Sequence, residues 1–349
     1  MLIFFKKTKY YSYKLFFITS LIASDSLFTE KNILNDKEFI PSNINGDYSF
    51  IIGGSFRNES SNYPSSSILA NLNKINKSDA SLIISLGDNY RELTDLCVDN
   101  FISSFATKVN KPIINAVGNH DLVPDYENDY FGKDYKDYNS RFGNTYYRFT
   151  IQNNLFIILD TELERFYIRG EQLSFLDKSL RMARESKTIQ NIFIFSHKNI
   201  WIPNLKDDNN FLTEILPKLK NITNKRIIWF SGDGYSNAKK DELYGSNMEF
   251  MAVSVDDKKD DFLLEVNCVG ENINYNFINL SGKPNPNFIF HQVSHDLPTV
   301  EIIKKSFLKN FSALIKTRDF KYGLLFSFII YFVGSYTLKF FRLKLLKEQ

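Results

Sequence analysis

Two short loops, at residues 85–90 and 116–121, constrain the fold of this chain more than any other feature. Each loop follows a short, uncharged, isoleucine-rich run, at residues 81–84 and 112–115, and such runs are typical of buried strands. Both loops are therefore expected to leave the C-terminal ends of strands. In open α/β sheets this edge is where ligands bind.

Three polar side chains in these loops are expected to converge. Gly87 and Gly118 allow the backbone to turn sharply as it leaves each strand, which directs Asp88, Asn119 and His120 towards one point. A carboxylate, an amide oxygen and an imidazole together suit a divalent cation that binds phosphate. The two loops therefore predict a metal-dependent phosphate site.

The composition is that of an ordinary globular domain with attached segments, because 43% of the 349 residues are hydrophobic and 24% are charged. The net charge is only +3, from 43 basic and 40 acidic residues, and no basic stripe interleaved with aromatic residues follows the strand pattern, so nucleic acid is not an expected partner. Cys97 and Cys268 have no metal-binding spacing. They are expected to be two separate buried thiols or, in an exported domain, one disulfide.

Both ends of the chain carry membrane-related signals. Lysines and an apolar run precede small residues, so residues 1–26 are predicted to be a secretory signal peptide or an uncleaved anchor. Residues 322–341 approach the roughly 20 residues that span a bilayer, which favours a transmembrane helix over a buried core helix. The N-terminal signal places the globular part outside the cytoplasm (periplasmic, extracellular or lumenal) and the basic tail, residues 342–349, inside.

The segment between these ends divides into three parts. Residues 27–46 are a polar connector, residues 47–299 form one domain, and residues 300–321 are predicted to be an amphipathic helix, either interfacial or packed on the domain. In the domain, strands and helices alternate first and consecutive strands follow. This order predicts an α/β (α+β) fold, a four-layer αββα sandwich of two stacked mixed sheets with outer helices. Residues 124–144 are expected to form a long loop.

The individual elements follow from hydrophobic periodicity. The expected strands are residues 48–52, 81–84, 112–115, 146–151, 155–160, 192–195, 227–230, 251–255, 262–266, 273–278 and 288–290. The expected helices are residues 68–75, 93–109, 170–185 and 211–219.

Two later strand ends supply further polar candidates, His197 within residues 195–201 and Asp233 within residues 230–235. With these, the order of motifs over residues 48–235 resembles the calcineurin-like metallophosphoesterases, nearest their purple acid phosphatase branch. That family places the motifs GDxH or GDxG, GD, GNH[DE], a lone His and GHxH at strand ends around two metal ions. Here GD and GNHD match in full, and His197 matches the lone His.

The first and last motifs depart from the family pattern. Gly54 and Phe56 occupy the two ligand positions of the first motif, and neither side chain can bind a cation. The last motif has Asp233 and Tyr235 where the family has histidines. For the first of the two ions that the resemblance implies, only Asp88 therefore remains an assured ligand.

The second ion that the resemblance implies keeps a full set of ligands if Asp233 ligates, although a turn cap is an equal alternative for that residue. The ligands would be Asp88, Asn119, His197 and Asp233. The expected cofactor is thus one divalent metal ion, with Mn, Zn, Fe, Mg and Ca not distinguished, or no metal at all. His120 would protonate the leaving group, and hydrolysis would be reduced or altered.

Two functions from different classes fit these residues. One is a membrane-anchored, exported metallophosphoesterase-like protein that hydrolyses an unidentified phosphorylated substrate with a reduced site. The other is a catalytically inactive binding or scaffolding module at the membrane. The loss of the first motif favours the module, whereas the retained Asn119, His120 and Asp121 favour catalysis.

Overall fold

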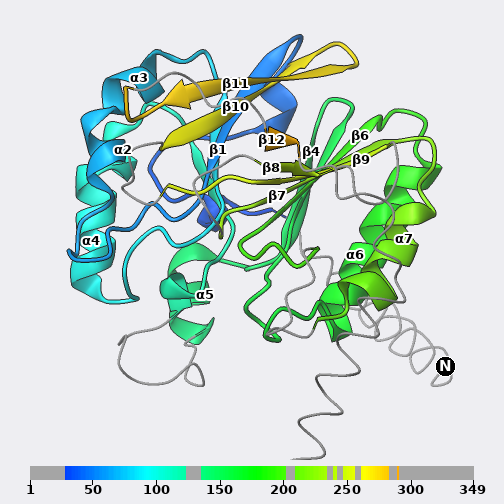
Figure 1. Ribbon diagram of the computed structural model, residues 1–349, viewed down its shortest axis with the longest axis horizontal. Coiled ribbons are helices and arrows are strands. Elements are labelled where there is room, and N and C mark those ends of the chain that lie inside the picture. Colours follow the sequence, from blue (N-terminus) through cyan, green and yellow to red (C-terminus); the bar gives the residue numbers. More distant parts are fainter. Residues whose placement is uncertain are drawn as a thin grey trace, which may run out of the picture. The chain divides into compact units, whose positions relative to one another are not determined.

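Two mixed β-sheets form the centre of the part of the chain that the computed structural model describes (Figure 1). The described residues are 28–122, 135–201, 209–233, 239–241, 247–255, 261–282 and 289–290. All of them lie in one unit, Met1–Val293. The strand order is β11-β10-β1-β2-β3 in the first sheet and β12-β8-β9-β7-β6-β5-β4 in the second.

The first sheet places the two sequence loops side by side. Its strands are β1 (Tyr48–Gly53), β2 (Leu82–Ser85), β3 (Ile113–Asn115), β10 (Phe262–Val269) and β11 (Asn272–Asn279). β1, β2 and β3 are parallel, and every residue in them is buried, as their uninterrupted apolar sequences predict. The loops that follow these three strands therefore leave the same edge of the sheet.

The second sheet brings a further group of parallel strands to the site. Its strands are β4 (Tyr147–Ile151), β5 (Asn154–Ile158), β6 (Asn191–Ser196), β7 (Arg226–Ser231), β8 (Lys239–Asp241), β9 (Met248–Ala252) and β12 (Ile289–Phe290). β4 and β5 form the expected antiparallel hairpin. β5, β6, β7 and β9 are parallel neighbours, so the loops after β6 and β7 also leave one edge.

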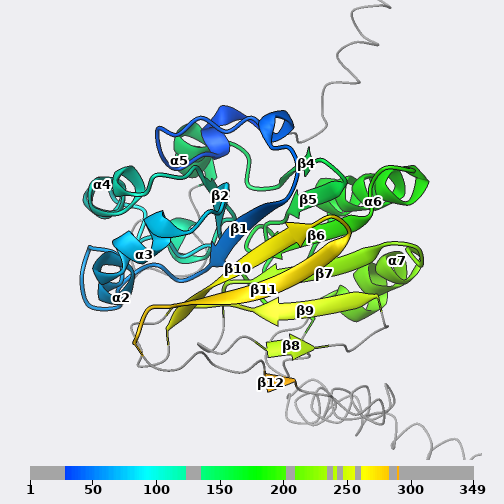
Figure 2. The ribbon, with the colours of Figure 1, turned by 90° about the horizontal axis from the view of Figure 1, so that it is seen from above.

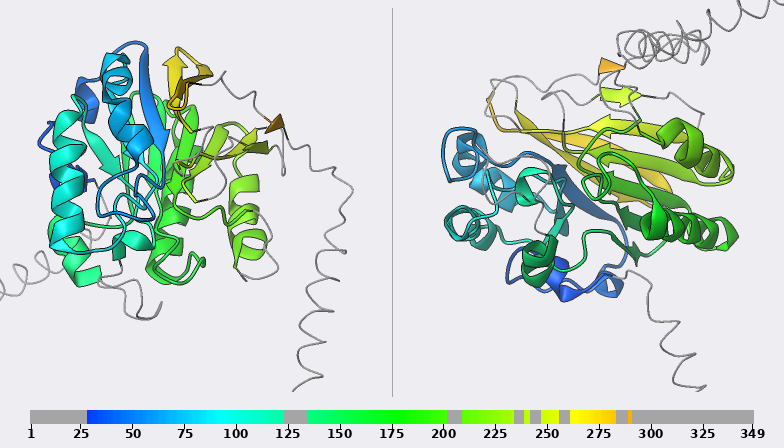
Figure 3. Two further views of the ribbon diagram at one scale, coloured as in Figure 1. Left: turned by 60° about the vertical axis from the view of Figure 1, so that its left-hand side comes forward. Right: turned by 90° about the horizontal axis from the view of Figure 1, so that it is seen from below.

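Helices cover the outer faces of both sheets (Figures 2 and 3). The helices on the first sheet are α2 (Ser66–Ala70), α3 (Leu72–Lys77) and α4 (Asp95–Ser104). The helices on the second sheet are α6 (Gly170–Glu185) and α7 (Leu216–Lys220), the latter preceded by a π-helical turn, Phe211–Ile215. This arrangement confirms the prediction of an α/β fold with two mixed sheets and helices.

Alternation along β1 explains how the layers are joined. Phe50 and Ile52 pack into the core between the sheets, whereas Ile51 packs under the helices, as the two-residue period of a strand requires. Phe50 meets Phe156 of β5 edge-on at 5.3 Å between ring centroids, and Phe156 stacks on Phe195 of β6 at 5.8 Å. These contacts hold the two sheets together beneath the strand ends that carry the polar loops.

Three local expectations differ from the structure. Part of the predicted loop at residues 124–144 is a helix, α5 (Tyr135–Phe142), in which Tyr138 and Phe142 are buried one turn apart. The predicted helix at residues 93–109 ends at Ser104 as α4 and continues only as a 3₁₀ turn, Ala106–Lys108. The strand expected at residues 251–255 begins three residues earlier, because a fully buried apolar run does not mark its own ends.

Cys97 and Cys268 are both buried free thiols, which confirms the first of the two alternatives for the cysteines. They lie in different parts of the core, Cys97 under the helices of the first sheet and Cys268 between the two sheets. Cys97 and Cys268 therefore form no disulfide with each other.

The segments predicted to meet a membrane lie outside the described residues. They are the signal peptide or anchor at residues 1–26, the amphipathic segment at 300–321, the transmembrane helix at 322–341 and the tail at 342–349. Among the helices that the structure does describe, none combines the length and the hydropathy that crossing a bilayer requires.

Tyr147 links the two sheets at the base of the site and gives a first testable prediction. Its buried hydroxyl donates a hydrogen bond to the carbonyl oxygen of Asn115, the last residue of β3. We expect Tyr147→Phe to lower the free energy of unfolding by about 1 kcal/mol, because that buried carbonyl loses its partner. Urea unfolding measures the loss. Tyr146→Phe is the matched control, since the Tyr146 ring keeps its packing on Phe175, and a loss as large in the control would contradict the prediction.

Candidate functional site

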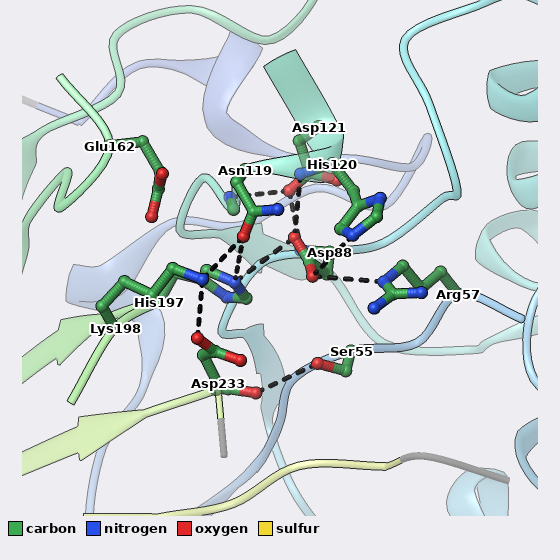
Figure 4. Close-up of polar contacts among 12 residues, drawn as sticks. Ser55, Arg57, Asp88, Asn119, His120, Asp121, Glu162, His197, Lys198 and Asp233 are labelled. Carbon is green, nitrogen blue, oxygen red and sulfur yellow. Dashed lines mark hydrogen bonds and ion pairs between the residues drawn. The ribbon is translucent and has the colours of Figure 1, made fainter. Parts of the chain in front are cut away.

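The polar residues of the site come from the ends of five strands, as Figure 4 shows for the side chains. β1 is followed by Ser55 and Arg57, β2 by Asp88, β3 by Asn119 and His120, β6 by His197 and Lys198, and β7 by Asp233. The structure thus brings all five sequence-predicted site residues to one place. It also places two cationic side chains, Arg57 and Lys198, among them.

Asp88 lies in a left-handed backbone turn. Its φ is 57° and that of Gly87 is 89°, a region that aspartate adopts more readily than most residues other than glycine. The neighbouring loop approaches closely, since a Cβ on Gly118 would lie 2.3 Å from Oδ1 of Asp88. Only glycine therefore fits at residue 118. Glycine is also favoured at residue 87, because its φ is positive.

Asp121 fastens the two loops to each other. Its Oδ2 accepts hydrogen bonds from the backbone N–H of Asp88 and of Gly118, both at 2.9 Å, and its Oδ1 accepts one from the N–H of Asn89 at 2.8 Å. Burial and the adjacent Asp88 carboxylate raise the pKa of Asp121 to about 7, while the hydrogen bonds from Gly118 and Asn89 oppose this rise. The residue is fully buried and acts as the common anchor of both motifs.

Three of the four predicted metal ligands converge. The Nε2 atom of His197 lies 3.3 Å from Oδ1 of Asp88 and 3.2 Å from Oδ1 of Asn119. The other ring nitrogen, Nδ1, is 2.9 Å from the carbonyl oxygen of Leu86, which can only accept, so Nδ1 carries the hydrogen of that bond. Nε2 is thereby directed at two oxygens, the arrangement of a donor set around a cation.

Lys198 places its ammonium group within that donor set. Nζ donates to Oδ1 of Asn119 at 2.8 Å and to Oδ2 of Asp233 at 2.6 Å. Burial disfavours the charged form, but the carboxylates of Glu162, Asp233 and Asp88 outweigh it and raise the pKa of Lys198 above its usual value. The ammonium is therefore a permanent positive charge at physiological pH, and its side chain is only 14% exposed.

Arg57 provides a second cation on the opposite side of Asp88. Its Nε lies 3.2 Å from Oδ2 of Asp88, and its Nη1 lies 3.0 Å from Oε1 of Glu59. Burial disfavours the ionised form of Asp88, but His197, His120, Lys198 and Arg57 together outweigh it and hold the pKa of that carboxyl well below its usual range. Asp88 is thus an ionised carboxylate with a cationic group on Oδ2 and a histidine on Oδ1.

His120, the predicted proton donor, borders the same carboxylate. Its Nε2 is 3.9 Å from Oδ2 of Asp88, its backbone N–H donates to Oδ1 of Asp88 at 3.1 Å, and its Nδ1 is 2.7 Å from the carbonyl oxygen of Arg91. Burial lowers the pKa of His120, although the charge of Asp88 opposes this shift. A neutral imidazole at neutral pH is a weak proton donor to a leaving group.

The two altered positions of the first motif belong to the packing of the fold. A Cβ on Gly54 would lie 2.4 Å from the Cα atom and 2.7 Å from the carbonyl oxygen of Gly232, so no other residue fits there without movement of the backbone. Phe56 is fully buried and packs edge-on against Phe105, at 5.5 Å between ring centroids, in the core beneath the helices. Of the two ligand positions that the resemblance assigns to a first ion, one is therefore a glycine enclosed by main chain and the other is a phenylalanine of the hydrophobic core.

The fit of a metal ion to the remaining residues can be judged from the same contacts. Among the described residues, no group of three or more His, Cys, Asp or Glu side chains has the geometry of a metal site. Asn119 and Asp233, two of the four predicted ligands, already share the ammonium of Lys198. A divalent ion does not fit this set while Lys198 is in place. Tyr235, at the other altered position, lies outside the described residues.

Sequence reasoning missed Arg57 and Lys198, and it missed the role of Asp121 as the anchor of both loops. Asp121 is the last residue of the GNHD motif, but the motif does not predict that its carboxylate accepts hydrogen bonds from the backbone of both loops. Lys198 directly follows the lone His, and Arg57 follows the first motif by one residue. Both residues are next to positions at which metal ligands were expected. Cationic side chains do not bind metal ions, however, so a motif for metal ligands does not include them.

Fold and site together define an α/β protein with a cluster of buried charged residues at the ends of parallel strands. No protein-family model matches the chain, and no curated protein sequence matches it. Among solved structures it is similar to GAP50, described as the anchor in the inner membrane complex of Plasmodium, with 14% identity over 72% of this chain and 93% of that one, at a TM-score of 0.50.

Two further structural neighbours have lower scores. One is a conserved uncharacterized protein, a predicted phosphoesterase, from Streptococcus pneumoniae, with 9% identity over 70% of this chain and 97% of that one and a TM-score of 0.33. The other is a single mutant of Vps29 from Entamoeba histolytica, with 8% identity over 66% of this chain and 98% of that one and a TM-score of 0.27. The likeness to GAP50 shows a shared fold.

Proposed function

We propose that this chain is a binding or scaffolding module with a phosphoesterase-like fold, held at a membrane, that does not hydrolyse phosphate esters. The observation that carries the proposal is the state of the first motif. Gly54 is packed against the backbone of Gly232, and Phe56 belongs to the hydrophobic core. Half of a two-metal site is thereby replaced by structural residues.

The loss of that half removes the chemistry that a two-metal hydrolase requires. In such sites a pair of ions lowers the pKa of a bound water and holds both the attacking and the leaving oxygen. Asp88 alone cannot provide the first ion's coordination, and one of its oxygens is paired with Arg57. The pKa of His120 is lowered by burial, which weakens it further as a proton donor.

Attachment to a membrane is the second part of the proposal. Its support is the apolar segment at residues 322–341, followed by a basic tail, together with the predicted N-terminal signal or anchor, which would orient the domain away from the cytoplasm. GAP50, whose fold is similar, is described as an anchor in a membrane complex. A similar role for this chain would need a stable folded surface but no catalysis.

Metal-dependent hydrolysis at a single ion is the other candidate function, and one observation favours it. Asp88, Asn119 and His197 converge within 3.3 Å, and His120 lies beside them. If Lys198 moved aside, these residues would bind an ion and polarise a phosphate. The predicted ligand set of Asp88, Asn119, His197 and Asp233 would then serve that ion.

The two functions are separated by measurements on the full chain purified in detergent. Elemental analysis is expected to find far less than one divalent ion per chain. p-Nitrophenyl phosphate and bis-p-nitrophenyl phosphate, with Mn²⁺, Zn²⁺, Fe²⁺, Mg²⁺ or Ca²⁺ added, are expected to be hydrolysed no faster by the wild type than by Asp88→Asn. Metal-dependent turnover that both Asp88→Asn and His120→Ala abolish would overturn the proposal and favour the one-metal hydrolase.

A further inference from the structure

We infer that Lys198 is a tethered cation that occupies a divalent-metal position, so that the chain retains a latent metal site which its own side chain closes. Nζ lies between Oδ1 of Asn119 and Oδ2 of Asp233, as Figure 4 shows. These are two of the oxygens that would bind an ion at the surviving half of the site.

The distances make the ammonium and a metal ion mutually exclusive. Nζ is 2.6 Å from Asp233 and 2.8 Å from Asn119, which are hydrogen-bond lengths, whereas divalent ions approach such oxygens to about 2.0–2.6 Å. An ion bound to both oxygens would therefore overlap the space that Nζ fills. Like charges so close together in a site of reduced dielectric constant also repel strongly.

The charge balance supports the same conclusion. Lys198 pairs with the carboxylate of Asp233, whereas Arg57 pairs with those of Asp88 and Glu59. An ion bound to Asn119 and Asp233 would replace the positive charge of Lys198. The ammonium thus supplies to Asp233 the positive charge that an ion would otherwise supply.

The backbone around Lys198 is held independently of its side chain. Its N–H donates to Oγ1 of Thr161 at 3.0 Å, and its carbonyl oxygen accepts from Oγ of Ser196 at 3.0 Å. The preceding His197 is fixed by Leu86. Removal of the side chain beyond Cβ should therefore leave the loop and His197 in position, with the oxygens of Asn119 and Asp233 exposed to a new cation.

The test uses the full chain in detergent, freed of metal by a chelator, and its variant Lys198→Met. The methionine keeps the apolar stem of lysine but is one atom shorter, so it removes both the charge and the atom at the position of Nζ. Titration calorimetry with Mn²⁺ and with Zn²⁺ is expected to show one bound ion in Lys198→Met, with an affinity at least about 100-fold above that of the wild type, because a repelling charge is gone. Adding His197→Ala to Lys198→Met should abolish this binding.

Lys218→Met is the matched control. Lys218 also pairs with a carboxylate, Asp177, at 2.8 Å, but this pair joins the outer helices α6 and α7. This variant should bind Mn²⁺ no better than the wild type. Equal metal affinity in Lys198→Met and wild type would overturn the inference, and so would stoichiometric binding of an ion by the wild type at His197.

A folding defect in Lys198→Met would not prevent a decision. Without metal, the unpaired carboxylate of Asp233 should lower the Tm by about 5 °C. Saturating Mn²⁺ should recover this loss in Lys198→Met and leave the Tm of the wild type unchanged, because binding to the folded state stabilises it. If Lys198→Met is unfolded and neither Mn²⁺ nor Zn²⁺ restores its folding, the inference is wrong.

The inference rests on the proposed function in one respect, the assumption that the wild type holds no ion. The possible results nevertheless distinguish a failure of the inference from a failure of the proposed function. A wild type that neither binds metal nor hydrolyses esters, with no gain of binding in Lys198→Met, contradicts only the inference. Metal binding by the wild type without turnover also contradicts only the inference. Metal binding with turnover contradicts both.

Discussion

Replacement of Asp121 by alanine is expected to lower the free energy of unfolding by about 4 kcal/mol, because three buried backbone N–H groups lose their acceptor at once. These are the N–H groups of Asp88, Asn89 and Gly118, each within 2.9 Å of the carboxylate. Since these donors belong to the loops after β2 and β3, the change should loosen both motifs together. Guanidinium unfolding at neutral pH measures the loss.

Two companion variants separate the anchor role from a general effect of charge. Asp121→Asn keeps one acceptor oxygen but turns an NH₂ group towards a backbone N–H, so about half of the loss is expected. Asp99→Ala, at an exposed position of α4, should change the free energy of unfolding by less than about 0.5 kcal/mol. A similarly small change in Asp121→Ala would mean that the two loops do not depend on this carboxylate.

Gly54→Asp, which introduces the aspartate that the resemblance to the metallophosphoesterases implies at this position, is expected to destabilise the protein by about 3 kcal/mol without creating a site for an ion. The cause is steric, because the new Cβ would lie 2.4 Å from the Cα atom of Gly232, and main chain cannot yield as a flexible side chain can. Gly232 is itself confined, since its own Cβ would meet the carbonyl oxygen of Leu86 at 2.2 Å. Thermal unfolding and metal titration together test both halves of this expectation.

Gly54→Ala is the comparison that assigns the cause. It carries the offending Cβ without the carboxylate, so most of the destabilisation should already appear in it. A Gly54→Asp variant as stable as the wild type that also binds an additional Mn²⁺ ion would contradict the prediction. That result would mean that residue 54 lacks only a metal-binding side chain, and that the packing of Gly232 does not prevent an ion from binding there.

These expectations give the site a consistent physical description. Polar residues from several strand ends meet around Asp88, which is buried and ionised. Arg57 pairs with one oxygen of Asp88, and Lys198 binds Asn119 and Asp233, where the resemblance would place ions. A site neutralised in this way can stabilise the fold and present a constant surface, which suits a module that binds or anchors.

Most of the fold followed from local patterns. The amphipathic helix at residues 170–185 matches α6 at both ends, because its apolar positions recur at helical spacing and the polar face is distinct. The β4–β5 hairpin was equally clear from two apolar runs separated by a polar turn. In contrast, α5 lies in a stretch rich in Tyr, Asp and Lys whose apolar residues show no clear period. Its helical state depends on the burial of Tyr138 and Phe142 in the core.

The convergence of Asp88, Asn119, His120, His197 and Asp233 was also foreseeable, because each follows a strand and parallel strands end at a common edge. Local sequence could not show what fills the space between them. The ammonium of Lys198, in the loop after β6, reaches Asn119, which is 79 residues away in the sequence, and Gly54 is closed by the backbone of Gly232, in the loop after β7 of the other sheet. Such contacts depend on the packing of two sheets and on the reach of single side chains, and a linear motif encodes neither.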